Sequence, residues 1–151
     1  MSKNFKCVDT NETYEDILVS FHSKWLEHFL SKKISYVFRK RIPITFKPNK
    51  LFIYLTNPHK MVIGYSKIKD VFYANKAEGY NYLEKACLDS EEYRKYVDVN
   101  DEIGVYEVEH IKIAKKHLTL NYIRKTFLKF APPQSFVKIS KEATDFLMKA
   151  Q

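Results

Sequence analysis

The densest group of residues able to do chemistry is a run of three cations, Arg39, Lys40 and Arg41, at the end of a segment that alternates in polarity. On an extended strand, successive side chains point to opposite sides, so Arg39 and Arg41 would share one side and Lys40 would take the other. Two guanidinium groups on one side can clamp a phosphate or stack on a base. A solvated basic edge that keeps strands from aggregating explains the same run, and the residues by themselves leave both interpretations open.

A second feature is the sequence Pro-Pro-Gln-Ser-Phe at residues 132–136. The paired prolines stiffen a turn that presents the amide of Gln134, the hydroxyl of Ser135 and the ring of Phe136 in succession. A simple chain reversal that delivers Phe136 to the core is the alternative, and the motif taken alone favours it.

Standard phosphate-binding loops are missing from the sequence, because its three glycines, Gly64, Gly79 and Gly104, stand apart from one another. The five histidines include no pair at the spacing with which one helix face binds a metal, and His22 and His28 are six residues apart. We therefore expect neither a metal site nor a cofactor.

Charge is unevenly distributed along the chain. The 26 Lys and Arg residues exceed the 18 Asp and Glu residues, which gives a formal net charge of +8. Residues 21–50 hold eight basic and one acidic residue, residues 110–141 hold eight basic and no acidic residues, and residues 84–109 hold nine acidic and three basic residues. This division predicts a basic face, for which nucleic acid is the commonest polyanionic partner, and a separate acidic face. A solvated lysine-rich surface is the alternative to nucleic-acid binding.

Length and composition indicate one globular domain, since the chain has 151 residues, 45% of them hydrophobic and 29% charged. The longest apolar stretch, residues 51–55, is far shorter than the roughly 18 residues that a membrane span needs. The first residues lack the apolar segment of a secretory signal, and the separation of Cys7 from Cys87 is typical of a reducing compartment. We therefore expect a cytoplasmic monomer without membrane contact.

Hydrophobic periodicity and turn residues predict strands in both halves of the chain and helices inserted among them. The expected strands cover residues 16–21, 34–42, 51–56, 61–72, 103–113 and 135–139, and the expected helices cover residues 22–33, 74–97, 118–130 and 140–149. Ser23 is expected to cap the first helix, Asp89 and Ser90 to break the second, and Gly64 to mark a bulge or a close backbone approach. Strands and helices do not alternate regularly, so we expect the α+β class, with helices around a small mixed β-barrel.

Several stretches together resemble ASCH domains of the PUA-like superfamily. Residues 19–41 (VSFHSKWLEHFLSKKISYVFRKR) are similar to the opening of these domains, which runs as a strand with SIKP, a helix and SGxKTVEFRKR. Residues 51–58 and 62–65 are similar to the family's IYATSP and VIGEF, and residues 132–136 match its closing PPQSF. The resemblance keeps the same order from residue 16 to residue 139.

This resemblance implies a compact barrel with a cleft beside the first helix, in which PUA-like relatives bind RNA or hold a flipped or modified base. Some small ASCH proteins are amidohydrolases that deacylate acetylated cytidine with a lysine, a threonine and a later glutamate. Here Ile34 stands in place of that lysine and Val37 in place of that threonine, and neither side chain can abstract a proton or attack a carbonyl. Ser35 keeps a hydroxyl nearby, His22 replaces the lysine of SIKP, and Tyr65 replaces the glutamate of VIGEF.

The expected function is therefore non-catalytic binding of RNA, or of single-stranded nucleic acid with a modified base, in a basic cleft. We expect residues 16–140 to form the ASCH-type domain, residues 1–15 an extension and residues 141–151 a C-terminal helix. The expected binding residues are Arg39, Lys40, Arg41, His22, Lys24, Ser35, Tyr54, Tyr65, Gln134 and Ser135, and none is expected to be catalytic.

Two other functions remain open at this point. One is a small amidohydrolase or nucleotide hydrolase that acts on an acylated nucleoside such as acetylated cytidine through Ser35, together with His22 or a nearby lysine. The other is a protein-interaction domain that docks through the acidic segment 84–109.

Overall fold

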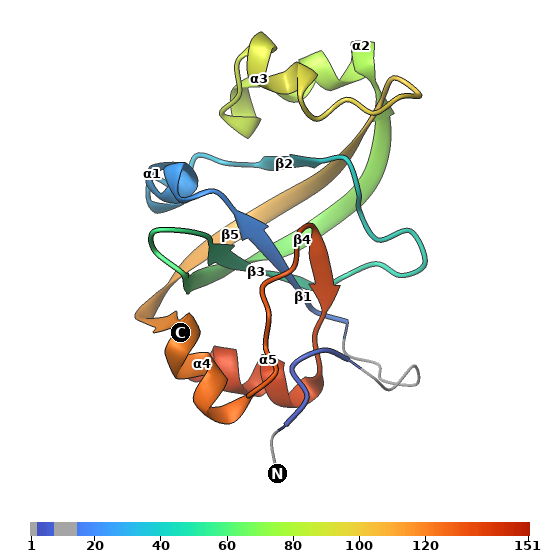
Figure 1. The fold of residues 1–151 in the computed structure, drawn as a ribbon. Helices are drawn as coiled ribbons and strands as arrows, with labels where there is room; N and C mark the ends of the chain where they lie inside the picture. Colours follow the sequence, from blue (N-terminus) through green and yellow to red (C-terminus); the bar gives the residue numbers. More distant parts are fainter. Residues whose placement is uncertain (1–2, 8–14) are drawn as a thin grey trace.

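The protein is described by a computed structural model that covers residues 3–7 and 15–151. Within these residues one mixed sheet has the strand order β2-β5-β4-β3-β1-β6, in which β1 runs parallel to β3 and the other neighbouring pairs are antiparallel. The strands are β1 (Ile17–Phe21), β2 (Tyr36–Arg39), β3 (Lys50–Leu55), β4 (Met61–Asn75), β5 (Glu102–Thr119) and β6 (Phe136–Lys138). The sheet curls into a half-barrel (Figure 1), which confirms the α+β class and the small mixed barrel.

Helical segments lie at both ends of the sheet, and α1 (Leu26–Leu30) lies beside it (Figure 1). They are η1 (Ser23–Trp25), α1 (Leu26–Leu30), α2 (Lys76–Gly79), η2 (Tyr80–Tyr82), η3 (Glu84–Ala86), α3 (Ser90–Arg94), α4 (Leu120–Thr126) and α5 (Lys141–Met148). The segments from α2 to α3, here called the helical insert (residues 76–94), cover one end of the half-barrel, and α4 and α5 lie at the other (Figure 1).

Two hydrophobic clusters occupy the two faces of the sheet. Ile17, Val19 and Phe21 of β1 belong to one cluster and Leu18 belongs to the other, because successive side chains of a strand point to opposite faces. A strand that is buried on both faces needs a continuous apolar run, and β1 has one. β1 is therefore held in the interior of the domain, and it fixes the position of the residues that follow it.

Several elements differ in length from their expected ranges. β4 and β5 run on to Asn75 and Thr119 because each pairs with the other along almost its whole length, and this pairing is not visible in either local pattern. The helix expected at residues 22–33 is shorter and ends at Leu30, and the helix expected at residues 118–130 is limited to α4. The expected break before α3 is confirmed, since the Asp89 side chain accepts a hydrogen bond from the backbone N–H of Glu92.

The cap of the first helical segment is one residue earlier than expected. His22, not Ser23, is the N-cap, and its Nδ1 accepts a hydrogen bond from the backbone N–H of Lys24 at 3.1 Å. The Ser23 hydroxyl instead donates to the backbone carbonyls of Thr56, at 2.5 Å, and Asn57, at 2.9 Å. Ser23 is buried, so tertiary contacts with the turn after β3 replace its local capping role.

Gly64 lies at an irregularity of β4, as expected. The register between β4 and β5 shifts between Val62 and Gly64, and a Cβ atom on Gly64 would overlap the backbone carbonyl of Lys112. A residue without a side chain is therefore required here, both for the bulge and for the close approach of two strands.

The described part of the N-terminal segment packs into the domain. Phe5 is buried, with its ring centre 4.4 Å from that of Phe130 and 5.2 Å from that of Phe127. Lys6 forms an isolated antiparallel bridge with Ile139. Residues 3–6 therefore lie beside β6 and the loop after α4.

Candidate functional site

A cleft of about 520 Å³ opens where the chain leaves β1 and β2 and enters β6. Its lining contains seven of the ten expected binding residues: His22, Lys24, Arg39, Lys40, Arg41, Gln134 and Ser135. Ser20, Trp25, Lys95 and Tyr96 complete the lining. Three segments that are distant in the sequence, residues 20–25, 39–41 and 134–135, therefore meet at one surface.

Arg39 forms the inner wall of this cleft and is held in one position. Its Nη1 donates to the carbonyl of Phe38 at 2.7 Å and its Nη2 to the carbonyl of Ser20 at 3.0 Å. The guanidinium carbon also lies 4.4 Å from the centre of the Phe21 ring, which is within the range of a cation–π interaction. Burial lowers the pKa of Arg39, yet an arginine side chain stays protonated in proteins. The cleft therefore contains a fixed, largely desolvated cation.

The Arg39 charge has no carboxylate partner among the described residues, whose ion pairs all involve other side chains. No Asp or Glu is part of the cleft lining, whereas five Lys and Arg side chains are. Of these, Lys24 pairs with Glu92 of α3 at 3.3 Å. An unpaired cation in a partly desolvated position favours an anionic ligand, because Coulomb interactions strengthen as water is removed.

The expected alternation of the basic run does not hold. β2 ends at Arg39, so Lys40 and Arg41 lie in the irregular segment that follows, and all three residues line the same cleft. Lys40 and Arg41 are exposed, whereas Arg39 is half-buried. The site therefore combines one anchored guanidinium with two exposed cations at its rim.

His22 contributes a defined hydrogen-bond donor. Its Nδ1 accepts from the backbone N–H of Lys24, so in the neutral ring the proton resides on Nε2. The imidazole is exposed at the cleft and can donate from Nε2 to an acceptor bound there. As long as the cap is intact, the neutral ring has no free nitrogen lone pair with which to act as a general base.

Lys95 and Tyr96, which directly follow α3, are the two functional candidates that sequence reasoning missed. The Tyr96 ring centre lies 6.0 Å from the Arg39 guanidinium carbon, and the ring is half-buried. These residues belong to the acidic segment 84–109, which the charge distribution predicts to form a separate face. Their only sequence signal is a lysine and a tyrosine at the end of an otherwise acidic helix.

Three of the expected binding residues lie elsewhere. Tyr54 is buried in the second hydrophobic cluster, with its ring centre 6.2 Å from that of Phe130, because β3 is buried on both faces. Tyr65 packs against Phe52 and lines a separate groove with Lys50, Lys67 and Lys112. Ser35 is outside the cleft lining, and its backbone bonds with Lys85 and Val108.

The two positions that match the amidohydrolase lysine and threonine are part of the core. Ile34 is 3% exposed and Val37 is 5% exposed, and both belong to the first hydrophobic cluster. Both line a small cavity that also touches Trp25, Arg39 and Tyr96, and their apolar side chains offer no proton acceptor and no nucleophile.

Within the part of the chain that the structure describes, no group of three or more His, Cys, Asp or Glu side chains could hold a metal ion. None of the helices within residues 3–7 and 15–151 is long and apolar enough to cross a membrane.

Comparisons with known proteins identify the fold. No family model matches the chain. An ASCH domain-containing ribonuclease from Zymomonas mobilis is 25% identical over 136 residues, which cover 89% of this chain and 90% of that protein. The crystal structure of ASCH from Zymomonas mobilis superposes with a TM-score of 0.80 at 23% identity, over 89% of this chain and 94% of that one. This chain folds as an ASCH domain.

The resemblance seen in the sequence is therefore confirmed at the level of the ASCH fold. A more distant neighbour is human THYN1, solved in complex with 5-methylcytosine-containing DNA, with a TM-score of 0.54 and 10% identity over 90% of this chain and 96% of that one. Within the ASCH fold, the chain of this protein places an anchored arginine and several exposed cations at the cleft.

Proposed function

We propose that this ASCH domain binds nucleic acid in the cleft, with single-stranded RNA as the ligand. The observation that carries the proposal is the Arg39 guanidinium, which two backbone carbonyls fix at a cleft without acidic lining. A phosphate is the anion whose planar, bidentate recognition suits such a group. The names of the similar proteins support this class of ligand, since one is a ribonuclease and another was solved with DNA.

Each cleft residue has a role that its chemistry suits. Arg39 and Arg41 contact phosphate oxygens, and the His22 Nε2–H donates to a base or phosphate acceptor. Gln134 offers an amide that can both donate to and accept from a base edge. Tyr96 provides an aromatic surface on which a base can stack. A duplex buries its base faces and Watson–Crick edges, so a single strand with accessible bases, modified or not, fits these groups best.

The test is a fluorescence-anisotropy titration with a ten-nucleotide single-stranded RNA at several salt concentrations. Arg41→Gln should weaken binding about tenfold and lower the slope of log K against log salt by about 0.7, the contribution of one phosphate contact. Lys69→Gln, an exposed lysine outside the cleft, is the matched control. Equal effects of the two substitutions, or no RNA binding at low salt, would contradict the proposal.

RNA cleavage is the second candidate, and the name of the Zymomonas protein is the observation that favours it. The cleft holds the hydroxyl of Ser135 and the Nε2–H of His22 beside several cations, which would stabilise charge on a phosphorane. The test is incubation of the RNA with the protein in the presence of a chelator, followed by gel analysis of fragments. RNA fragments that form in the presence of the chelator and are absent with the Arg39→Lys variant would establish cleavage by this site. Intact RNA would mean that the site binds RNA without cleaving it.

The amidohydrolase alternative gains no support from the site, because Ile34 and Val37 are apolar and buried and Ser35 is outside the cleft lining. Turnover of acetylated cytidine that is lost in Ser35→Ala would restore it. Docking through the acidic segment 84–109 stays a hypothesis, and size-exclusion chromatography tests the expected monomer.

A further inference from the structure

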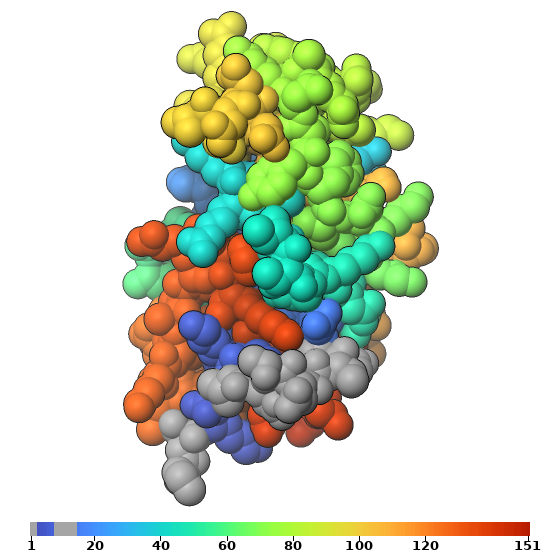
Figure 2. All heavy atoms as spheres, turned by 90° about the vertical axis from the view of Figure 1, so that its right-hand side faces the viewer, coloured from blue at the N-terminus to red at the C-terminus, as the bar shows by residue number. Residues whose placement is uncertain are grey.

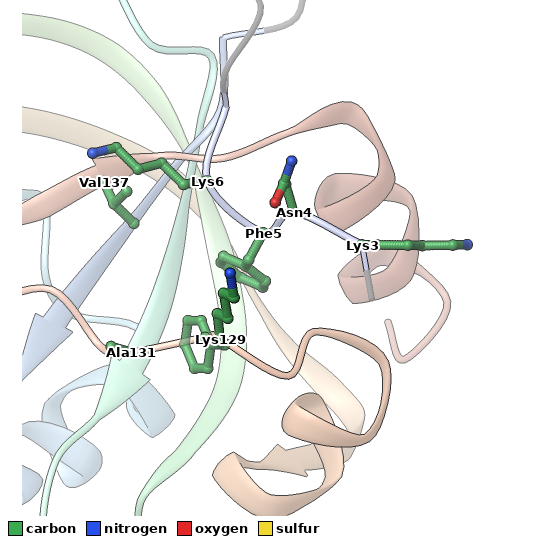
Figure 3. A pocket seen from close by; sticks show the side chains of 8 residues that line it. Lys3, Asn4, Phe5, Lys6, Lys129, Ala131 and Val137 are labelled. Atoms are coloured by element: carbon green, nitrogen blue, oxygen red, sulfur yellow. The ribbon is translucent and has the colours of Figure 1, made fainter. Parts of the chain in front are cut away.

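A second groove lies next to the cleft, and its exposed side chains have none of the roles assigned above. It measures about 340 Å³ and is formed by the N-terminal segment, the loop after α4 and β6. Figure 3 shows its lining side chains, among them the Phe5 ring and the lysines that extend from the backbone around it. The buried rings of Phe5 and Phe130 form the floor of the groove. The lining residues are Lys3, Asn4, Phe5, Lys6, Lys129, Phe130, Ala131 and Val137.

One short stretch of chain separates this groove from the cleft. Phe130 and Ala131 line the groove, and Gln134 and Ser135, a few residues later, line the cleft. In Figure 2 the segment after β2 (cyan), the segment that leads into β6 (red) and the N-terminal segment (blue) lie next to one another on one face. The cleft and the groove are therefore neighbours, and a ligand that passes over residues 131–135 reaches both.

The groove matches the cleft in charge. Lys3, Lys6 and Lys129 are exposed, and none of them takes part in an ion pair among the residues that the structure describes. Among residues 3–7 and 15–151, no acidic side chain is part of the lining. Such a surface attracts a chain of phosphates without reading its sequence, because lysine acts as a point charge.

The floor of the groove excludes base stacking as its main function. Phe5 is 5% exposed and Phe130 is 4% exposed, and their ring centres lie 4.4 Å apart in the core. A base finds no free aromatic face there, so the lysine ammonium groups are the part of the groove that a nucleic acid can contact.

We infer that the groove continues the cleft as a binding track for the sugar–phosphate backbone, so that the ligand is a polynucleotide and not a free nucleoside or mononucleotide. This inference rests on the proposed function, since the same strand places its recognised nucleotide in the cleft. Lys6 and Lys129 contact flanking phosphates beyond the Gln134–Ser135 turn. The track gives affinity, and the cleft gives selectivity.

The experiment compares a three-nucleotide RNA with a ten-nucleotide RNA in anisotropy titrations from low to moderate salt. The double variant Lys6→Gln/Lys129→Gln should weaken binding of the ten-nucleotide RNA about tenfold and lower its salt slope by about 1.4, the contribution of two single-strand contacts. Affinity for the three-nucleotide RNA, which fills only the cleft, should stay within about twofold of wild type. The matched control is Lys67→Gln/Lys112→Gln, which removes the same charge from the separate groove beside Tyr65.

The outcomes distinguish the inference from the function on which it rests. If Arg41→Gln weakens both RNAs and Lys6→Gln/Lys129→Gln weakens neither, the cleft stands and the track is wrong. An equal loss in the Lys67→Gln/Lys112→Gln control also overturns the track, because the attraction is then a property of net charge. If the wild-type protein binds neither RNA, the proposed function and the inference both fail.

Discussion

The guanidinium carbon of Arg39 lies 4.4 Å from the centre of the Phe21 ring, and this contact joins the last residue of β2 to the last residue of β1. The two strands are not neighbours in the sheet, since β5, β4 and β3 lie between them in its order. Curling of the sheet brings their ends together. The cleft therefore exists because the sheet is curved, and Arg39 marks the place where it curves back on itself.

Arg39 should be irreplaceable by lysine. A lysine ammonium cannot form the planar pair of bonds to the Phe38 and Ser20 carbonyls, so Arg39→Lys should lower the free energy of unfolding by about 1 to 3 kcal/mol and weaken RNA binding. Arg41→Lys, the same change at an exposed site, should alter stability by less than about 0.5 kcal/mol. Urea unfolding of the two variants decides, and equal stability losses would show that the Arg39 bonds contribute nothing.

His22 has two roles that substitution can separate. His22→Ala removes the N-cap of η1 and should lower the free energy of unfolding by about 1 kcal/mol, whereas His22→Asn keeps a capping side chain and should restore it. Neither variant has an imidazole Nε2–H, so both should weaken RNA binding. Thermal melts measure the first effect and anisotropy the second. Full binding by His22→Asn would show that the imidazole makes no contact with the ligand.

Tyr96 should contribute through its ring. Tyr96→Leu removes the aromatic face and should cost about 1 to 3 kcal/mol of binding free energy with single-stranded RNA, since that is the range for stacking of one base. Tyr96→Phe keeps the ring and should bind within about twofold of wild type. If the two variants bind equally, whether well or poorly, stacking on Tyr96 is not part of recognition.

Gly104 should resist even the smallest side chain. A Cβ atom there would lie 2.5 Å from the Arg39 carbonyl oxygen and 2.8 Å from the Ile42 side chain, so Gly104→Ala must displace the end of β2. Overpacking of this kind costs about 1 to 3 kcal/mol, and the displacement should also weaken RNA binding because it moves Arg39. Denaturant unfolding and anisotropy measure the two effects. A fully stable variant with reduced binding would contradict the overpacking argument.

Asp16 should make stability depend on pH. Burial raises the pKa of this fully buried carboxyl, against opposing contributions from the Lys50 charge, the Lys50 backbone N–H and the Thr144 hydroxyl. The folded state then binds a proton that the unfolded state, with a pKa of about 3.9, has already released. The contribution of Asp16 to stability is therefore greatest below about pH 4 and declines as the pH rises through its raised pKa.

The comparison for Asp16 is its asparagine variant, which cannot titrate. The difference in free energy of unfolding, wild type minus Asp16→Asn, should fall between about pH 4 and neutral pH, by at most about 1.4 kcal/mol per pH unit for one proton. Urea titrations across this range measure it. A difference that rises with pH would mean that the Lys50 interaction outweighs burial and that the pKa is lowered.

Local sequence patterns determined much of the fold. The apolar run of β1 and the break before α3 depend on neighbouring residues, so they could be predicted from the chain alone. The order of the family-like motifs predicted the ASCH fold, and the clustering of basic residues pointed to Arg39, Lys40 and Arg41. These features depend on side-chain type and short spacing, which the sequence states directly.

Only the tertiary structure decided which candidates share a surface. Tyr54 and Tyr65 belong to strands that alternate between two faces, and pairing of β3 and β4 buries the first and sends the second to another groove. Tyr96 reaches the cleft because the helical insert folds back over β2, a long-range contact that no local pattern encodes. Similarly, the Ser20 carbonyl meets the Arg39 guanidinium only when the sheet curls. The sequence by itself determined which chemical groups the chain carries, and the curvature of the sheet determined which of these groups lie together.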